Sequence, residues 1–338
     1  MSGNGDERAK AFADLTTADV QEVFDRTDYV AGDDIVTTVL LALRLGKPLL
    51  VEGAPGAGKT ELAKVLAEGF DSELIRLQCY EGLAAENTLY EWNYTKQLLS
   101  VQAGERTSPS VPDTGTETEE RREREAEESE TGGTSVFGEE YLMERPLLRA
   151  LSTDGETPPV LLIDEVDRAD EELEALLLEV LSDFQVSIPE FGTVSAGVPP
   201  IVVITSNRTR GLSDALKRRC LYLHVEPPSY EKERTIVDRK VPELDGAVAA
   251  EVCGATHRLR QEPLLKQPGV AETLDWARAV AALRTGENGQ KDGDLTPAEI
   301  ENTLGCLLKE VEDVTRVDSE LLESLLESAR EARARAEG

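Results

Sequence analysis

Residues 53–60 contain the residue types that hold the phosphates of a nucleotide. They match the pattern G-x-x-x-x-G-K-[ST] as Gly53, Ala54, Pro55, Gly56, Ala57, Gly58, Lys59 and Thr60, and Glu61 follows directly. The glycines let backbone N–H groups converge on phosphate oxygens, while the N-terminus of the next helix adds its positive dipole end. In such a loop the lysine reaches the β- and γ-phosphates and the threonine hydroxyl binds Mg²⁺. We therefore predict a nucleotide-phosphate site at residues 53–61.

Two carboxylates follow an apolar run later in the chain. Residues 160–163 read Val-Leu-Leu-Ile, and Asp164 and Glu165 come next. Mg²⁺ needs a second oxygen ligand, and hydrolysis needs a residue that orients the attacking water. Because ligands of open α/β sheets bind beyond the carboxyl ends of the strands, this pair would lie beside the phosphates. We expect Asp164 to hold Mg²⁺ through water and Glu165 to activate the nucleophilic water. Taken alone, the same pair suits a strand leaving the core.

The elements that must position these residues alternate between strands and helices. Apolar runs predict strands at residues 49–52, 74–78, 160–163, 201–205 and 221–225, and helical spacing predicts helices within residues 20–45, 61–69 and 171–184. Short apolar strands that alternate with helices indicate a parallel sheet covered on both faces. The predicted fold class is α/β, a P-loop parallel sheet sandwiched between helices.

The strand signals stop after Pro227 and Pro228. Helical patterns then run over residues 230–241, 271–283, 297–312 and 319–337. We place a domain boundary near residue 227. Residues 1–27 would form an N-terminal segment, residues 28–226 an α/β nucleotide-binding domain, and residues 227–338 a smaller all-helical domain that ends in a C-terminal helix.

One segment of the α/β region has a different composition. Between about residues 103 and 135 the chain is rich in Glu, Thr, Ser, Gly and Arg and has almost no large apolar side chain. Such a segment cannot build a core. We expect an acidic, disordered surface insertion, and a dedicated acidic recognition segment is the alternative.

The chain as a whole is strongly acidic. Its 338 residues include 36 Lys and Arg against 67 Asp and Glu, for a net charge of -31, and Arg outnumbers Lys by 25 to 11. This charge argues against nucleic-acid binding, since phosphate backbones are bound mainly by clustered cations, and against an anionic membrane surface. A hydrophobic content of 40% indicates a folded chain. Acidic residues spread over the whole length favour a salt-adapted, halophilic cytoplasm, where high salt screens the self-repulsion. An acidic mesophilic protein with one acidic tail is the alternative.

The remaining signals exclude several site types. The four cysteines have no ligand-like spacing and only two histidines accompany them, so we expect neither a metal cluster nor a disulfide framework. The first residues lack the apolar core of a signal peptide, and no run approaches the roughly 18 apolar residues of a membrane span. We expect a cytoplasmic protein without membrane contact.

The order of the motifs resembles that of AAA+ ATPases. After the phosphate loop and the Asp-Glu pair, residues 204–207 read Ile-Thr-Ser-Asn and residues 214–220 read Asp-Ala-Leu-Lys-Arg-Arg-Cys. In that family the apolar strand that ends in the Asp-Glu pair is called the Walker B strand. The polar residue that ends the strand beside it is sensor 1, which implies Asn207. An arginine near the end of the next helix is a finger that reaches a neighbouring subunit's nucleotide, which implies Arg219, with Arg218 as the alternative. Without the resemblance, both arginines would be a solvated helix end favoured by the helix dipole.

Further segments are similar to the MoxR-type branch, specifically the ATPases associated with aerobic carbon monoxide dehydrogenase and similar molybdenum hydroxylases. The similar segments are residues 77–83, 89–94, 145–148 and 164–169 within a match over about residues 28–285 that excludes the acidic insertion. The resemblance implies a ring-forming, commonly hexameric chaperone ATPase that matures a metalloenzyme together with a von Willebrand factor A-domain protein. Alternating Tyr90, Trp92 and Tyr94 suit a partner contact, although packing against the core is the simpler interpretation.

Three regions depart from the family pattern or extend it. MoxR-type lids carry a sensor 2 arginine at the start of their second helix, but residues 269–273 have Glu272 there, and Arg278 follows about two turns later. We expect Arg278 to be a surface or subunit-facing arginine, and a substitute for the sensor 2 arginine is the alternative. Residues 184–199 alternate like a β-hairpin, which in the family can act on substrate and which equally suits a structural role. Residues 29–31 and the lid would border the adenine, and an ordinary packing segment is the alternative.

These observations favour an ATP- and Mg²⁺-dependent remodelling ATPase. A DNA-directed AAA+ motor or loader would need a basic stripe, and the sequence has only scattered arginines. A nucleotide-switched interaction protein with little turnover is less consistent with a chain that has both Asp164 and Glu165.

Overall fold

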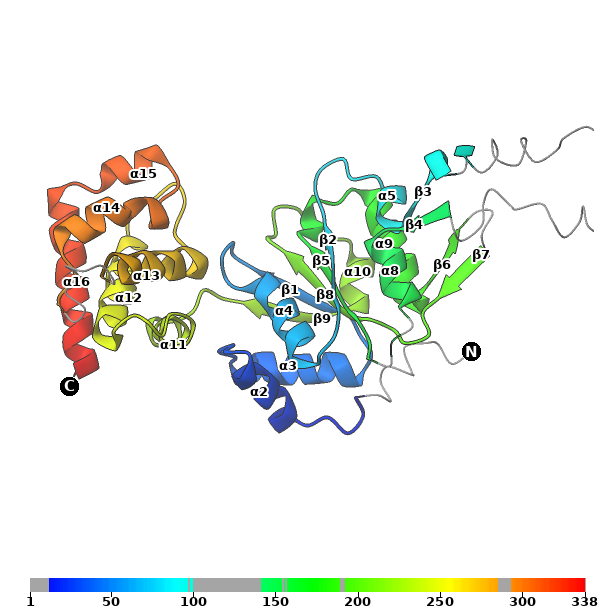
Figure 1. The fold of residues 1–338 in the computed structure, drawn as a ribbon, viewed down its shortest axis with the longest axis horizontal. Helices are drawn as coiled ribbons and strands as arrows, with labels where there is room; N and C mark the ends of the chain where they lie inside the picture. Colours follow the sequence, from blue (N-terminus) through cyan, green and yellow to red (C-terminus); the bar gives the residue numbers. More distant parts are fainter. Residues whose placement is uncertain are drawn as a thin grey trace, which may run out of the picture.

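The computed structural model describes residues 12–96, 98–99, 141–153, 155, 157–188, 192–284 and 293–337. The predicted acidic insertion lies outside these residues, as do residues 1–11. The described chain has an α/β unit up to residue 225 and a helical unit from residue 230 onward (Figure 1). The predicted boundary near residue 227 falls between the two.

A five-stranded parallel sheet forms the centre of the α/β unit. Its strands lie in the order β2 (Leu74–Gln78), β5 (Val160–Asp164), β8 (Ile201–Ser206), β1 (Leu49–Gly53) and β9 (Leu221–Val225). Every residue of β1, β5 and β8 is buried, as expected for inner strands that helices cover on both faces. The predicted strands are confirmed, and these three extend one residue further at their carboxyl ends. Those ends bring the polar site residues to one edge of the sheet.

Helices cover both faces of the sheet. One face packs on α2 (Thr17–Arg26), α3 (Asp33–Arg44) and α4 (Lys59–Gly69), and the other on α5 (Glu86–Leu89), α8 (Pro146–Ser152), α9 (Glu171–Asp183) and α10 (Asp214–Arg219). The single helical stretch expected within residues 20–45 is two helices. Asp28 adopts a left-handed φ of 55°, and Gly32 forms the extended N-cap of α3. This break places residues 29–31 in a loop beside the phosphate-binding loop.

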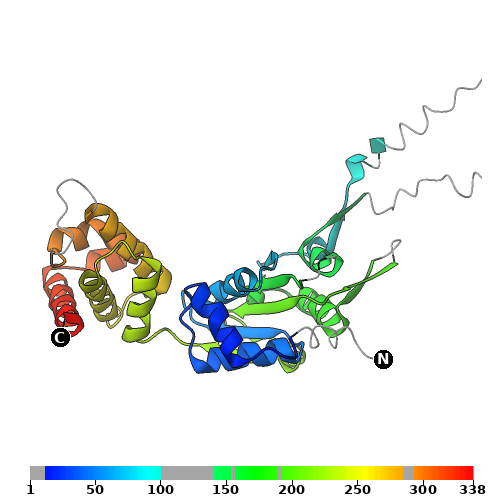
Figure 2. The ribbon, with the colours of Figure 1, turned by 60° about the horizontal axis from the view of Figure 1, so that its bottom comes forward.

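Two antiparallel ribbons project from the end of the α/β unit that lies away from the helical unit (Figures 1 and 2). One pairs β3 (Tyr90–Trp92) with β4 (Leu142–Glu144), and the other pairs β6 (Gln185–Ile188) with β7 (Gly192–Ser195). The predicted hairpin over residues 184–199 is therefore confirmed. The Tyr90 and Trp92 rings meet edge to face with centroids 5.8 Å apart. Trp92 is buried, in agreement with packing, whereas Tyr94 is 65% exposed.

The helical unit has its own apolar core, centred on the fully buried Trp276. Its helices are α11 (Tyr230–Lys240), α12 (Gly246–Leu259), α13 (Val270–Arg284), α14 (Pro297–Leu307), α15 (Val311–Arg316) and α16 (Ser319–Glu337). The helix expected over residues 297–312 ends at Leu307, because Leu308 turns extended and buried. Helix α12 had no counterpart in the prediction, since most of its residues are buried and it lacks a polar stripe. Within the described residues, none of the helices has the length and apolarity needed to cross a bilayer.

Candidate nucleotide-binding site

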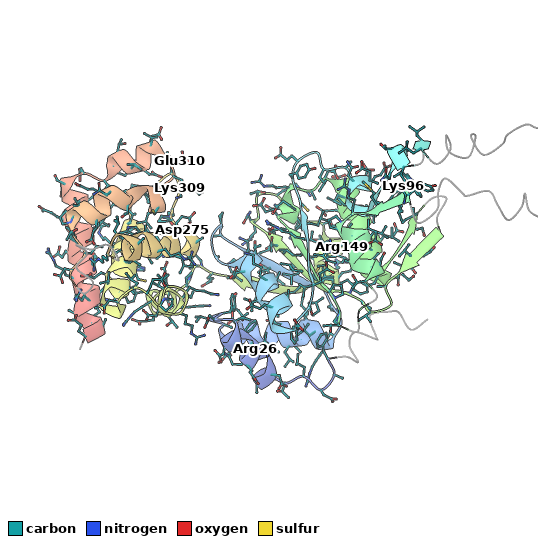
Figure 3. All side chains as sticks on the ribbon, viewed as in Figure 1. Arg26, Lys96, Arg149, Asp275, Lys309 and Glu310 are labelled. Carbon is teal, nitrogen blue, oxygen red and sulfur yellow. The ribbon has the colours of Figure 1, made fainter. Side chains whose placement is uncertain are left out.

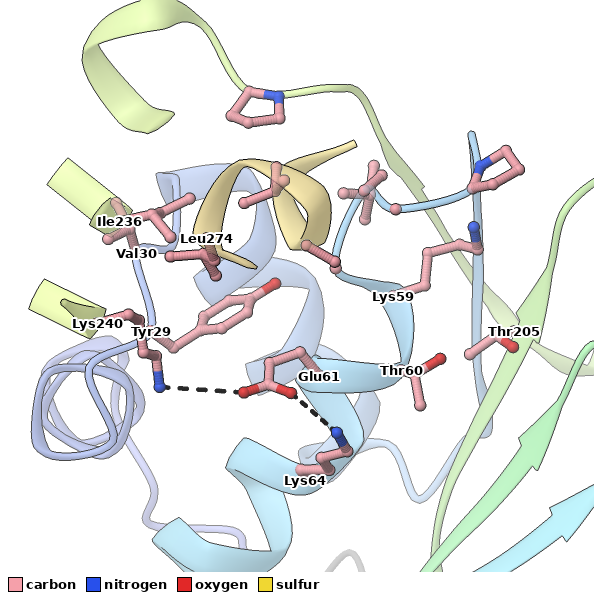
Figure 4. Close-up of a pocket in the computed structure, with 18 of the residues that line it drawn as sticks. Tyr29, Val30, Lys59, Thr60, Glu61, Lys64, Thr205, Ile236, Lys240 and Leu274 are labelled. Carbon is pink, nitrogen blue, oxygen red and sulfur yellow. Dashed lines mark hydrogen bonds and ion pairs between the residues drawn. The ribbon is translucent and has the colours of Figure 1, made fainter. Parts of the chain in front are cut away.

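A cavity of about 480 Å³ lies at the carboxyl edge of the sheet, between the α/β unit and the helical unit (Figure 4). Its wall includes the phosphate-binding loop, the ends of β5 and β8, residues 28–30, and one face each of α11 and α13. It is large enough for a nucleotide, and typical ligand pockets have volumes of about 300–1,000 Å³. Because both units line it, a ligand here would contact both.

The phosphate-binding loop has the backbone that its glycines permit. Gly56 and Gly58 have φ values of 76° and 88°, in the left-handed region, and α4 begins at Lys59. Lys59 is 6% exposed, and its Nζ donates to the carbonyl oxygens of Gly53 at 2.9 Å and Ala54 at 2.8 Å. Burial lowers the pKa of Lys59, and nearby carboxylates partly offset the effect. The ammonium group is thus held inside the loop, where phosphate oxygens would replace the carbonyl acceptors.

Thr60 and Asp164, the two residues expected to hold Mg²⁺, lie together. The Thr60 hydroxyl donates to Asp164 Oδ1 at 3.0 Å, and the Thr205 hydroxyl donates to the same oxygen at 2.5 Å. Asp164 is 3% exposed. A hydroxyl and a carboxylate are hard oxygen donors that suit Mg²⁺ bound jointly with phosphate oxygens and water. The described residues contain no cluster of three or more His, Cys, Asp or Glu that would hold a metal by itself.

Glu165 is held by amides from the strands on both sides of β5. Asn207 Nδ2 donates to Glu165 Oε1 at 3.3 Å, and Gln78 Nε2 donates to Oε2 at 3.2 Å. The Glu165 backbone N–H donates to the Thr205 hydroxyl at 2.9 Å, and the residue has a left-handed φ of 56°. These contacts fix the carboxylate at the cavity wall, where an attacking water would need it.

Gln78 is a site residue that sequence reasoning missed. It is the last residue of β2, and β2 lies beside β5 in register with Gln78 opposite Asp164. The sequence signal that could have identified Gln78 is its place as a polar residue at the end of an apolar strand. The order of the strands in the sheet, which decides its neighbours, was not available.

Asp167 supports the loop that carries Asn207. Its carboxylate accepts the backbone N–H of Asn207 at 3.1 Å and both the N–H and the hydroxyl of Thr209, at 3.0 and 2.5 Å. Burial disfavours the charged form, but the hydrogen bonds from Thr209 and Asn207 outweigh this and hold the pKa of Asp167 below its ordinary value. An ionised Asp167 therefore ties the residues after β5 to the loop after β8.

The structure does not bring Arg218 and Arg219 into the cavity of their own chain. Both lie exposed at the end of α10. Arg219 Nε donates to Ser182 Oγ at 2.9 Å, and its Nη1 donates to the Ala215 carbonyl oxygen at 3.3 Å. Neither arginine lines the cavity. Any action on a nucleotide would have to be on that of another subunit.

The helical unit contacts the phosphate-binding loop through backbone atoms. The N–H of Val270, at the start of α13, donates to the Gly56 carbonyl oxygen at 3.2 Å. Glu272 occupies the expected sensor 2 position, and its Oε2 accepts the N–H of Gly269 at 2.9 Å. Arg278 lines the cavity, is half exposed and lies 3.4 Å from Asp275. The residue at the sensor 2 position thus caps α13, and an arginine further along the helix reaches the cavity.

Apolar and aromatic side chains gather at the far end of the cavity, beside the ion pairs of Glu61 with Lys240 and Lys64. Tyr29, Val30, Ile236 and Leu274 face one another there, close to Glu61 (Figure 4). Burial, together with Glu61 and Asp34, raises the pKa of Tyr29 to about 12, so that the phenol stays neutral. This end suits a flat, aromatic base, in line with the expected place of the adenine near residues 29–31.

Comparison with known proteins decides the family. Residues 49–226 match the model of the ATPase family associated with various cellular activities (AAA), which is more than half of the chain. The chain belongs to the AAA family. The matched region includes the phosphate-binding loop, Asp164, Glu165 and Asn207, and it ends just before the helical unit. None of the curated proteins compared with this AAA chain matches it.

Solved structures of RuvB from Thermotoga maritima are among those similar to the AAA chain. One of them, a point mutant of RuvB, is 16% identical over 92% of this chain and 82% of that chain, with a TM-score of 0.47. The Holliday junction branch migration motor is 17% identical over 89% of this chain and 78% of that chain, with a TM-score of 0.44.

Proposed function

We propose that the protein is an ATP-hydrolysing AAA+ remodelling ATPase of the MoxR type. The observation that supports turnover best is the Glu165 carboxylate, held by the amides of Asn207 and Gln78 beside the Thr60–Asp164 pair. A protein that only binds nucleotide has no need for an oriented base at this place. ATP would bind with its phosphates on residues 53–61 and its base at the apolar end of the cavity.

The side chains of the phosphate-binding loop and of the ends of β5 and β8 each have a role in the proposed reaction. Lys59 exchanges its two loop carbonyls for phosphate oxygens, and Glu165 orients the attacking water and accepts its proton. Asn207 fixes the carboxylate and the water, because its amide already contacts Glu165. Thr60 and Asp164 would hold Mg²⁺, which when bound neutralises charge on the phosphates.

Turnover would depend on assembly into a ring, which we take to be a hexamer. Arg219 is exposed and lies outside its own cavity, as an arginine that acts on a neighbour's nucleotide must. Arg218 is the alternative. Arginine fingers contribute about 10³- to 10⁵-fold to the rate in related chemistry. The isolated subunit would therefore hydrolyse ATP slowly.

The client would be a metalloenzyme of the molybdenum hydroxylase or carbon monoxide dehydrogenase kind, with a von Willebrand factor A-domain protein as partner. The support is the resemblance of residues 77–83, 89–94 and 145–148 to the MoxR type. The projecting ribbon β6–β7 offers a place for client contact. The net charge of -31 supports a salt-adapted cytoplasm and opposes binding to nucleic acid.

Capture of partners by the Glu165→Gln variant tests this proposal. With ATP and high salt, the variant should hold nucleotide and retain its partners, and the wild-type protein with ADP is the control. Recovery of a von Willebrand A-domain protein or a molybdenum hydroxylase subunit would support the MoxR assignment. Recovery of DNA-processing proteins alone would favour a DNA-directed motor, and tight ATP binding without turnover by wild-type assemblies would favour a nucleotide-switched interaction protein.

A further inference from the structure

Arg76 contacts the carboxylate that is expected to hold Mg²⁺. Its Nη2 lies 2.6 Å from Asp164 Oδ2, and the side chain comes from β2, the strand next to β5. The other Asp164 oxygen, Oδ1, already accepts the hydroxyls of Thr60 and Thr205. Arg76 therefore takes the one carboxylate oxygen that these hydroxyls leave unused.

The same guanidinium nitrogen connects Asp164 to Glu165 through Gln78. Arg76 Nη2 donates to Gln78 Oε1 at 2.5 Å, and Gln78 Nε2 donates to Glu165 Oε2 at 3.2 Å. The Arg76 side chain thus contacts Asp164, the carboxylate expected to hold Mg²⁺. It also orients the Gln78 amide, which contacts Glu165, the proposed base. A change at Arg76 would reach both carboxylates.

We propose that Arg76 is a positioning residue that neutralises Asp164 while the nucleotide site is empty and leaves it when a metal–nucleotide complex binds. The inference rests on the proposed role of Asp164 as a metal ligand. A guanidinium and a divalent cation repel each other, so Arg76 weakens metal binding at Asp164 and a bound metal weakens the Arg76 contact. Departure of Arg76 also removes the bond that orients Gln78, while Asn207 Nδ2 at 3.3 Å and Arg168 Nε at 3.1 Å keep the Glu165 carboxylate in place.

The exposure of the two partners supports this exchange. The Asp164 side chain is 4% exposed, whereas the Arg76 side chain is 52% exposed and lies on an edge strand. A buried carboxylate needs a positive partner. The half-exposed guanidinium provides one and can return to solvent at little cost.

Binding of Mn²⁺ to the nucleotide-free protein tests the inference without any hydrolysis. Free Mn²⁺ is measured by its electron paramagnetic resonance signal in a titration of wild-type protein and of Arg76→Gln and Arg76→Ala variants. Both variants should bind Mn²⁺ at least about tenfold more tightly, because the competing charge is gone. Arg76→Lys keeps the charge and should bind as weakly as wild type does.

Arg149→Gln is the matched control. Arg149 lies on α8 of the α/β unit, is 58% exposed, and pairs with Glu73, just before β2 (Figure 3). Its replacement removes an arginine of similar exposure without touching Asp164 and should leave Mn²⁺ binding unchanged. Adding Asp164→Asn to Arg76→Gln should abolish the gain.

Two results would overturn the inference. One is equal Mn²⁺ binding by wild type, Arg76→Gln and Arg76→Ala, and the other is a gain that survives Asp164→Asn. Failure of the proposed ATPase function looks different. If the ATPase proposal fails, no variant releases phosphate, but the Arg76 variants still bind Mn²⁺ more tightly than wild type. If the Arg76 inference fails, wild type still hydrolyses ATP, but the Arg76 variants bind Mn²⁺ no more tightly than wild type.

Discussion

Replacing Gly269 with alanine perturbs the contact between the helical unit and the phosphate-binding loop. The added Cβ would lie 2.8 Å from Gly56 Cα and 3.2 Å from the Gly56 carbonyl oxygen. Gly269 does not have a left-handed φ, so its backbone accepts alanine. The perturbation is therefore steric, and it also places the Cβ 3.1 Å from Glu272 Oε2, the carboxylate oxygen that caps α13.

The structure sets the size of the effect. An ordinary contact begins at 3.4 Å, so the two backbones must separate by 3.4 - 2.8 = 0.6 Å. If the units cannot move apart, overpacking costs about 1–3 kcal/mol. If they do, the hydrogen bond from Val270 to Gly56 is lost, at about 0.5–1.5 kcal/mol. The response with the lower free-energy cost sets the size of the effect. A cost of about 1 kcal/mol corresponds to a roughly fivefold loss of the docked arrangement of the two units.

Equilibrium titration with a fluorescent ATP analogue and Mg²⁺ measures this loss, since a nucleotide in the cavity would contact both units. Gly269→Ala should bind about fivefold more weakly than wild type. Gly305→Ala is the control in the same unit, because a Cβ there meets no atom within 4 Å. Unchanged affinity of Gly269→Ala would refute the claim that docking of α13 on Gly56 contributes to nucleotide binding.

Three further outcomes follow from the described contacts. Arg219→Ala should keep ATP affinity and lose at least about 10³-fold in hydrolysis by assembled protein, and normal phosphate release would remove the finger assignment. Thr209→Val removes a hydrogen-bond donor to Asp167. Because the folded-state pKa of Asp167 is lowered, its carboxylate stabilises the fold at pH values above its unfolded-state pKa, and this stability is lost as the pH falls through the folded-state pKa. In the variant this folded-state pKa lies closer to the unfolded value, so the variant's melting temperature should fall less on acidification than that of wild type and should level off at a higher pH, and superimposable pH profiles would contradict this. Gly254→Ala puts a Cβ 2.6 Å from that of Ala332 and should lower the free energy of unfolding of the helical unit by about 1–3 kcal/mol in a urea titration; equal or greater stability would refute it.

Local sequence patterns were enough for the elements and for the centre of the site. Fully apolar runs ending in polar residues located β1, β5 and β8, because inner strands are buried on both faces. The glycine and lysine spacing located the loop before α4. Parallel strands end at one edge, so Asp164, Glu165 and Asn207 had to lie close together there.

The rest depends on tertiary neighbours. Arg76 and Gln78 belong to the site only because β2 lies beside β5, and strand order is not written in any one strand. Helix α12 is buried on nearly all sides, so it has no amphipathic stripe to detect. The break between α2 and α3 at Asp28 interrupts neither the apolar spacing nor the helical propensity enough to be seen. The role of Glu272 as a helix cap rather than a phosphate sensor follows from its bond to Gly269.

Phosphate release by purified wild-type protein and its Glu165→Gln variant, with Mg²⁺ and ATP in high salt, tests the central claim. The wild-type assembly should hydrolyse ATP. The variant should bind ATP with similar affinity and lose about 10²- to 10⁴-fold in turnover, because it lacks the base that accepts the water proton. A variant that hydrolyses ATP at the wild-type rate would contradict the account.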